Sequence, residues 1–192
     1  MRRPQHTAVI RACAAGAAVL LIGARLVPGQ TPSETFTARA SVNTPGGAAA
    51  SAPVTIVVKR FAADADRDAM IAAIRKNGTV ASRLLATSPD AGVLQLGMQR
   101  TAIKYASQRA SANGRLITLL TAEPIMFVGV GLPDVKARTG SDLGLVRLEV
   151  PASGSGSGEL VPAAKIKVGA HGAIETEDYS DVVVRLLDAV RQ

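Results

Sequence analysis

An Asn-Gly pair between two β-like runs constrains the fold more than any other feature of this sequence. Residues 101–123 read TAIKYASQRASANGRLITLLTAE, with Asn113-Gly114 near the middle. Both central residues of a type I′ turn need positive φ angles, which Asn and Gly adopt most readily. We therefore expect a β-hairpin with Asn113-Gly114 as its two-residue loop, and with Ser107 facing Leu120.

The expected register sorts the side chains of this hairpin onto two faces. Ile117 and Leu119 share one face with polar side chains, so that face is mixed in character. A slip by one residue would exchange the two faces, and burial of one face therefore holds the register. The apolar face would collect Ile103, Tyr105, Leu116, Leu120 and Ala122.

Further strands are predicted on both sides of the hairpin by alternating or β-branched runs. We expect strands over 35–42, 54–61, 93–98, 143–150, 159–168 and 173–177. Residues 181–191 fit both a strand, through the run of three valines at 182–184, and one face of a helix. We favour the strand.

Two helices are expected between the second strand and the third. The first begins at Asp64, with acidic residues in its first turn and Arg75-Lys76 in its last, which matches the helix dipole at both ends. A shorter second helix begins at Thr79 and ends before Pro89. The predicted fold class is therefore α+β, a mainly antiparallel sheet built as a meander of hairpins with one or two helices inserted after the second strand.

The N-terminus has the composition of an export signal. A basic segment, MRRPQHTAVIR, precedes an apolar run over 12–24 and small residues up to Gly29. The run is shorter than the roughly 20 apolar residues that span a bilayer. We interpret residues 1–29 as a signal peptide and 30–192 as a single α+β domain, periplasmic or secreted. An uncleaved N-terminal anchor is the alternative.

Removal of this segment would leave a domain with little chemistry of its own. Cys13 and His6 would leave with the signal, so His171 would be the one remaining histidine. Thiol nucleophiles, disulfides and zinc sites with several histidines are then excluded by counting. Four of the 22 basic residues precede residue 30, which leaves 18 basic and 15 acidic residues in the rest. This near balance argues against nucleic acid as a partner.

One cluster could hold a metal ion. His171 lies close in sequence to Glu175 and Glu177, and an imidazole with two carboxylates can bind a divalent cation or serve in acid–base catalysis. The competing interpretation is a His-Gly turn followed by a solvated acidic strand. Since no motif accompanies the cluster, we expect no cofactor and keep these residues as metal candidates.

A second candidate is an apolar loop. Residues 124–141 combine prolines and glycines with large apolar side chains, and a loop of this kind can form the mouth of a pocket. The candidate pocket residues are Met126, Phe127, Gly129 and Gly131. Packing of the same loop against the sheet is the simpler alternative.

Four stretches carry a resemblance. The chain resembles a group of uncharacterised exported proteins of acidobacterial-type soil bacteria in VTIVVKRF with DADRDAMIAAIRKNGT, LQLGMQRTAIKYA, GRLITLLTAEPI and GSGSGELVPAAKIKV. The resemblance covers most of residues 34–192. It implies export and a single domain, and it supplies no activity and no catalytic residue.

These observations favour a small exported module without catalytic activity, which binds an envelope protein or a small ligand or serves a structural role. Two alternatives remain open. One is a small hydrolase or isomerase of the cell envelope whose carboxylates meet only in the folded chain; convergence of Glu123, Asp142, Glu149 or the acids over 175–181 in one cleft would favour it. The other is an envelope protein tethered to the membrane by the uncleaved N-terminal segment.

Overall fold

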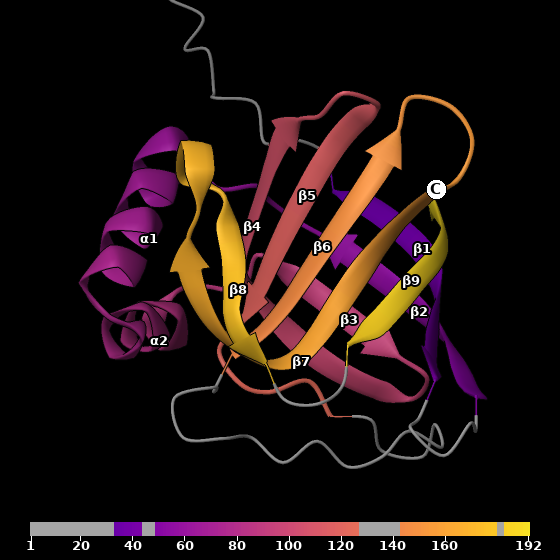
Figure 1. The fold of residues 1–192 in the computed structure, drawn as a ribbon, viewed down its shortest axis with the longest axis horizontal. Helices are drawn as coiled ribbons and strands as arrows, with labels where there is room; N and C mark the ends of the chain where they lie inside the picture. Colours follow the sequence, from indigo (N-terminus) through magenta and orange to yellow (C-terminus); the bar gives the residue numbers. More distant parts are fainter. Residues whose placement is uncertain (1–32, 44–48, 127–142, 180–182) are drawn as a thin grey trace, which may run out of the picture.

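The computed structural model describes residues 33–43, 49–126, 143–179 and 183–192. In these residues the chain forms strands, two α-helices and one 3-10 turn (Figure 1). Their order is β1 (Glu34–Asn43), β2 (Ala49–Val58), α1 (Asp64–Lys76), α2 (Gly78–Thr87), β3 (Gly92–Leu96), β4 (Gln99–Ala110), β5 (Gly114–Thr121), β6 (Leu143–Pro151), β7 (Gly156–Val168), η1 (Ala170–Gly172), β8 (Ile174–Tyr179) and β9 (Val184–Arg191). Each element lies close to the segment in which the sequence predicts it, including the strand form of β9.

Eight of the strands close into an antiparallel barrel. Strands β1 to β7 pair in chain order, and β9 then pairs with β7 on one side and with β1 on the other. Strand β8 runs along the same edge of β7 as β9, since Tyr179 faces Ala164 and Val184 faces Leu160. Strands β8 and β9 thus act as one interrupted strand, and only the β9 part belongs to the barrel wall.

The predicted open α+β meander is therefore wrong. The barrel closes where β1 meets β9, as in the pairs Thr37–Val190 and Ala40–Leu186. Hydrogen bonds from Gln192 to the Thr35 carbonyl (2.9 Å) and the Thr37 hydroxyl (2.8 Å) extend this seam. Local periodicity predicts individual strands, but it contains no information about pairing between the two ends of a chain.

The interior of the barrel is filled with apolar side chains. Alternate residues of each strand point inward, as the two-residue repeat of a strand requires. In β1 these are Phe36, Ala40 and Val42. They pack against inward-facing residues of the other strands, chiefly Ile56, Leu94, Leu96, Ile103, Ile117, Leu119, Leu148, Leu160 and Leu186.

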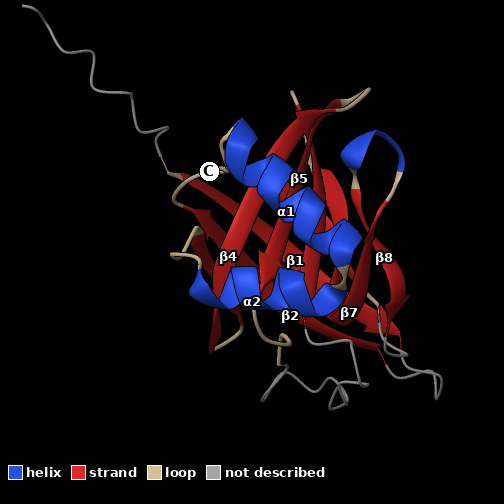
Figure 2. Ribbon diagram, turned by 90° about the vertical axis from the view of Figure 1, so that its left-hand side faces the viewer, coloured by secondary structure: helices blue, strands red, loops and turns tan. Residues whose placement is uncertain are grey.

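A second core lies outside the barrel, between its wall and the two helices. Figure 2 shows α1 and α2 against one side of the barrel. Met70 and Ile74 of α1 and Leu85 of α2 are buried there. They pack against the outward-facing residues Tyr105, Leu120, Leu145 and Val161. The helices therefore cover part of the wall, and the rest of the outer face is left without helical cover.

Asn77 lies between the two helices and forms a hydrogen bond with each. Asn77 follows the last residue of α1, and its backbone N–H donates to the Ala73 carbonyl (3.2 Å). Its side-chain Oδ1 accepts a hydrogen bond from the Val80 N–H (2.9 Å) and so caps the start of α2. None of the helices in the described residues is long and apolar enough to cross a membrane.

The register of the β4–β5 hairpin differs from the prediction by two residues. Ser107 faces Thr118, and the N–H of Ser111 donates to the Gly114 carbonyl (2.9 Å). The central turn residues are thus Ala112 and Asn113. A Cβ on Gly114 would collide with the Val150 carbonyl oxygen, so the glycine permits close approach of β6.

A shift of two residues keeps the same side chains on each face. Tyr105 and Leu120 lie on the helix-covered outer face, as the predicted grouping requires, whereas the mixed face with Ile117 and Leu119 turns out to be the barrel interior. The predicted grouping of Ile103 with Tyr105 on one face is wrong, because a register irregularity between these two residues turns Ile103 inward.

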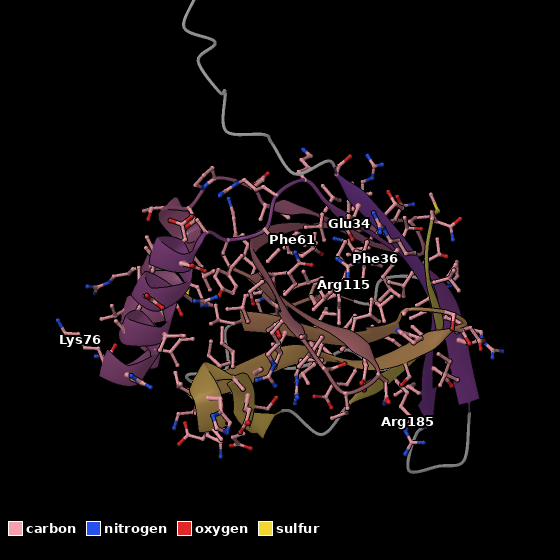
Figure 3. All side chains as sticks on the ribbon, turned by 90° about the horizontal axis from the view of Figure 1, so that it is seen from above. Glu34, Phe36, Phe61, Lys76, Arg115 and Arg185 are labelled. Carbon is pink, nitrogen blue, oxygen red and sulfur yellow. The ribbon has the colours of Figure 1, made fainter. Side chains whose placement is uncertain are left out.

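One end of the barrel is closed by an ion-pair network. Glu34, 7% exposed, accepts hydrogen bonds from Arg115 Nη1 (3.2 Å) and Nη2 (2.7 Å), and Arg191 Nε lies 3.5 Å away. Arg115 also donates to Gln108 (2.6 Å). Figure 3 shows Glu34 and Arg115 beside Phe36 at this end. The hydrogen bond from Arg115 holds the pKa of Glu34 below its ordinary value and raises that of Arg115.

Candidate functional site

A belt of polar side chains crosses the outer wall of the barrel at one level. Each belt residue is the direct register partner of the next: Ser51, Ser41, Arg185, Glu159, Arg147, Thr118 and Ser107, from β2, β1, β9, β7, β6, β5 and β4. Their sequence neighbours Ala40, Leu160 and Leu186 point inward. We call these seven residues the polar belt.

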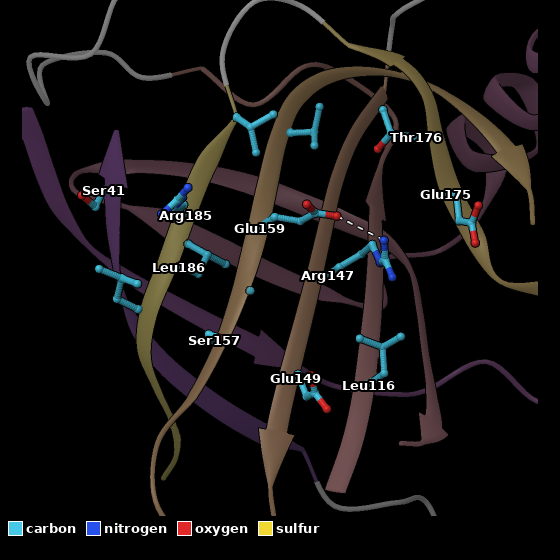
Figure 4. A pocket seen from close by; sticks show the side chains of 14 residues that line it. Ser41, Leu116, Arg147, Glu149, Ser157, Glu159, Glu175, Thr176, Arg185 and Leu186 are labelled. Carbon is cyan, nitrogen blue, oxygen red and sulfur yellow. Dashed lines mark hydrogen bonds and ion pairs between the residues drawn. The ribbon is translucent and has the colours of Figure 1, made fainter. Parts of the chain in front are cut away.

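The centre of the polar belt lies in an open groove of about 1040 Å³ (Figure 4). The groove is formed by strands, and neither α1 nor α2 contributes to it. Its polar lining is Ser41, Arg147, Glu149, Ser157, Glu159, Glu175, Thr176 and Arg185, and its aliphatic lining is Leu116, Val161, Val183 and Leu187, besides the inward-facing residue Leu186. We call this hollow the outer groove. It reaches across the β1–β9 seam, because Ser41 belongs to β1 and Arg185 to β9.

Charges alternate along the centre of the outer groove. Arg147 Nη1 donates to Glu159 Oε1 (3.2 Å), while Arg147 Nε is buried and has no hydrogen-bond partner. Arg185, on the other side of Glu159, is exposed and forms no ion pair within the described residues. Glu149 accepts a hydrogen bond from the Ser111 hydroxyl (3.0 Å). The guanidinium groups of Arg147 and Arg185, on either side of Glu159, therefore retain N–H donors that form no hydrogen bond within the described residues.

This arrangement suits recognition better than catalysis. Acid–base catalysis needs a proton donor and an acceptor that converge on one reacting position, in a site that limits access of water. Here Glu149 and Glu159 each have a separate donor, and the groove is open to solvent. A flat row of opposite charges with aliphatic neighbours is typical of a surface that contacts another molecule.

The predicted metal candidates are not brought together as a metal centre. His171 lies in η1 with a φ angle of 54°, and Glu177 of β8 pairs with Lys165 (3.0 Å). Glu175 points toward the outer groove and Gly169. Within the described ranges, no three His, Cys, Asp or Glu side chains lie close enough to hold a metal ion. The hypothesis of a metal site therefore gains no support from this part of the chain.

The predicted pocket loop falls mostly outside the described residues. Of its four candidates, Met126 is described and is 41% exposed, whereas Phe127, Gly129 and Gly131 lie outside. Met126 does not line the outer groove. The pocket-loop hypothesis remains a prediction.

Three residues at the centre of the groove were missed by the sequence reasoning. Arg147, Glu159 and Arg185 belong to three strands that were all predicted, but each is an ordinary charged residue on the solvent face of its strand. Only the register places them in one row. The signal available in the sequence is the alternation Arg147-x-Glu149 in an otherwise apolar strand, which indicates an exposed face without showing its neighbours.

Comparison with known proteins gives no relatives: no family model, no curated protein and no solved structure matches the chain. The class is therefore defined by the fold alone, a small closed antiparallel barrel with two helices on one side and a charged groove on its uncovered wall. The resemblance to acidobacterial exported proteins is not tested by these comparisons and remains a prediction.

Proposed function

We propose that this protein is an exported, non-catalytic binding module that holds a protein of the cell envelope against the outer groove. The observation that carries the proposal is the row Arg147–Glu159–Arg185 in direct cross-strand register on a wall without helical cover. The filled interior supports the same conclusion, because apolar side chains occupy the space in which a wider barrel would hold a ligand.

The charges of the groove define the partner's chemistry. Neighbouring strands lie about 4.8 Å apart, so Arg147 and Arg185 are separated by roughly 10 Å across Glu159. A protein segment that presents two carboxylates at that separation, with a basic side chain between them, would match all three charges. Leu116 and Leu187 would contribute apolar contact area beside this row. Aromatic platforms for sugars are absent from the lining of the groove, which favours a protein partner.

Affinity capture tests this proposal. The full-length chain is immobilised and exposed to a solubilised envelope fraction, alongside R147Q/R185Q and the matched control R75Q/R83Q, which removes two charges from the helices. We expect the wild type and the control to retain the same envelope protein, R147Q/R185Q to lose it at least tenfold, and retention to fall as salt is raised. Equal retention by both double variants would overturn the proposal, as would the absence of any specific retention at low salt.

The proposal of export is based on the N-terminal sequence, and a direct measurement can test it. Mass spectrometry of the protein recovered from the envelope and medium should give a first residue near Gln30. An intact Met1 or Arg2 in a membrane fraction would instead support the tethered form, with residues 12–27 as the anchor.

A second candidate function is a carboxylate-dependent hydrolase or isomerase. It is favoured by the presence of Glu149, Glu159 and Glu175 in the lining of one groove. Glu149 and Glu159 are diagonal neighbours on adjacent strands, a relation that separates two residues by roughly 7–8 Å. Hydrolysis of chromogenic esters or glycosides by the wild type, lost in both E149Q and E159Q, would replace binding by catalysis as the function.

A further inference from the structure

The charged row at the centre of the outer groove extends beyond Arg147, Glu159 and Arg185. Figure 4 shows Glu175 of β8 beyond Arg147, on the far side from Glu159. The signs along the row are positive, negative, positive and negative, for Arg185, Glu159, Arg147 and Glu175. Arg147 and Glu159 pair with each other, whereas Arg185 and Glu175 at the two ends form no ion pair within the described residues. A partner can therefore supply an acid at one end of the row and a base at the other.

The spacing of the row is set by the sheet. Arg147 faces Glu159, and Glu159 faces Arg185, in direct cross-strand register. Since neighbouring strands lie about 4.8 Å apart, the second and third charges follow the first at roughly 5 and 10 Å. The curvature of the barrel does not separate the first pair, because Arg147 Nη1 lies 3.2 Å from Glu159 Oε1. A partner therefore meets charges of alternating sign at short intervals.

The repeat of an α-helix matches this spacing better than the repeat of a β-strand. Residues i, i+4 and i+7 share one face of a helix, and the helical rise places the second and third at about 6 and 10.5 Å from the first. In an extended strand, residues i, i+2 and i+4 share a face, at roughly 6.7 and 13.4 Å. The third charge of a strand would thus miss its counterpart by roughly 4 Å, and that of a helix by only about 1 Å.

Aliphatic side chains flank the row on both sides. Val183 precedes Arg185 by two residues and Leu187 follows it by two, so these side chains lie on opposite sides of the row. Leu116 faces Glu149 on the next level of the wall. Val183, Leu187 and Leu116 all line the groove and are half-buried. Apolar contact is therefore available along both sides of the charged row, which suits an amphipathic helix with a charged centre and apolar flanks.

We propose that the partner segment in the outer groove is an amphipathic α-helix that lies across the strands. This inference rests on the proposed binding function and specifies the partner. Acids at i and i+7 face the two arginines, a base at i+4 faces Glu159, and a base at i+11 reaches toward Glu175. Aliphatic side chains of the helix contact Leu116 and Leu187.

Two designed peptides of identical composition test a helix against a strand. Both are alanine-based and about 18 residues long, with the same number of leucines. The helix-spaced peptide carries Glu, Lys, Glu and Lys at i, i+4, i+7 and i+11, and the strand-spaced peptide carries them at i, i+2, i+4 and i+6. Each is titrated into the full-length, isotope-labelled chain. We expect the helix-spaced peptide to give saturable shifts of the amide resonances of Arg147, Glu159 and Arg185, and the strand-spaced peptide to bind at least tenfold more weakly. Equal or tighter binding of the strand-spaced peptide, or no saturable shift with the helix-spaced one, would overturn the proposal.

A double-mutant cycle tests the central contact. Replacement of the i+4 Lys of the helix-spaced peptide by Gln should weaken binding to the wild type several-fold and binding to E159Q much less, because both changes remove the same ion pair. The control R75Q/R83Q should bind the helix-spaced peptide as the wild type does. An equal loss in the wild type and E159Q would show that this Lys does not face Glu159 and would overturn the proposed register.

The peptide titration and the capture experiment can fail separately. If an envelope protein is retained through Arg147 and Arg185 while the helix-spaced peptide does not bind, the binding function stands and the helical partner is overturned. If capture does not depend on these two arginines, the proposed function is overturned, and the helical partner with it.

Discussion

The ion-pair network of Glu34 joins three strands that are far apart in the sequence. It lies at the start of β1, yet its carboxylate is held by Arg115 of β5 and approached by Arg191 of β9. A carboxylate that is 7% exposed is costly to bury unless its charge is paired and hydrogen-bonded. Arg115 supplies both hydrogen bonds to this carboxylate, so displacement of β5 would leave the buried charge of Glu34 without its donors.

Substitution E34Q should reduce the free energy of unfolding by about 1–3 kcal/mol at pH 7, because it removes a charged hydrogen-bond acceptor that is mostly buried. Since the pKa of Glu34 is lowered in the folded state, its stabilising contribution is present above its ordinary value of 4.5 and is lost as the pH falls below it. The difference between wild type and E34Q in urea unfolding should therefore shrink in acid.

The matched control for E34Q is D188N, which breaks an exposed ion pair with Arg39 (3.0 Å). An exposed pair contributes less than about 1 kcal/mol, so D188N should change stability little at either pH. An effect of D188N as large as that of E34Q would contradict the special role of the barrel-end network.

Single residues also show what the sequence could reveal about the site. The exposed positions of Arg147 and Glu159 follow from strand alternation, but their adjacency follows from the β6–β7 register, which no local pattern encodes. Tyr105 was correctly grouped with Leu120 on one face. The cover that the helices provide for this face depends on packing between segments that are distant in the sequence.

The secondary-structure elements were predicted far better than their pairing. Acidic and basic ends indicated α1. The Asn-Gly dipeptide misled at Asn113-Gly114. There, Gly114 is needed for close contact with β6. The turn lies one residue earlier than predicted, and the register of β4 and β5 differs from the prediction by two residues.

Substitution N77A should cost about 1 kcal/mol of stability, because the N–H of Val80 loses its side-chain acceptor at the start of α2. Urea unfolding measures the loss. Ser82 is the control: its hydroxyl donates to the Gly78 carbonyl within α2 and is exposed, so S82A should be close to neutral. Equal costs for the two variants would show that the cap does not stabilise the helix pair.

Closure of the barrel could not be predicted from the sequence, because it is a property of the whole molecule. The β1–β9 seam joins residues such as Ala40 and Leu186, which are separated by nearly the entire domain. The outer groove takes residues from both sides of this seam, Ser41 from β1 and Arg185 from β9. In an open meander, the side of the groove that Ser41 supplies would be missing.

Removal of residues 184–192 should abolish cooperative unfolding. The truncation deletes β9, leaves the edges of β1 and β7 unpaired and exposes the interior around Phe36 and Leu160. Thermal unfolding monitored by circular dichroism measures the loss. Deletion of Gln192 alone removes only two hydrogen bonds to β1 and should lower the melting temperature by a few degrees. A cooperative transition that survives loss of the whole strand would contradict the closed barrel.

The most direct test is a nuclear Overhauser measurement across the seam in the labelled protein. We predict cross-strand backbone contacts between Thr37 and Val190 and between Ala40 and Leu186, as strong as those within the β4–β5 hairpin. If the hairpin contacts appear and the β1–β9 contacts do not, the sheet is open at this seam, and the closed barrel is ruled out together with the side of the outer groove that Ser41 supplies.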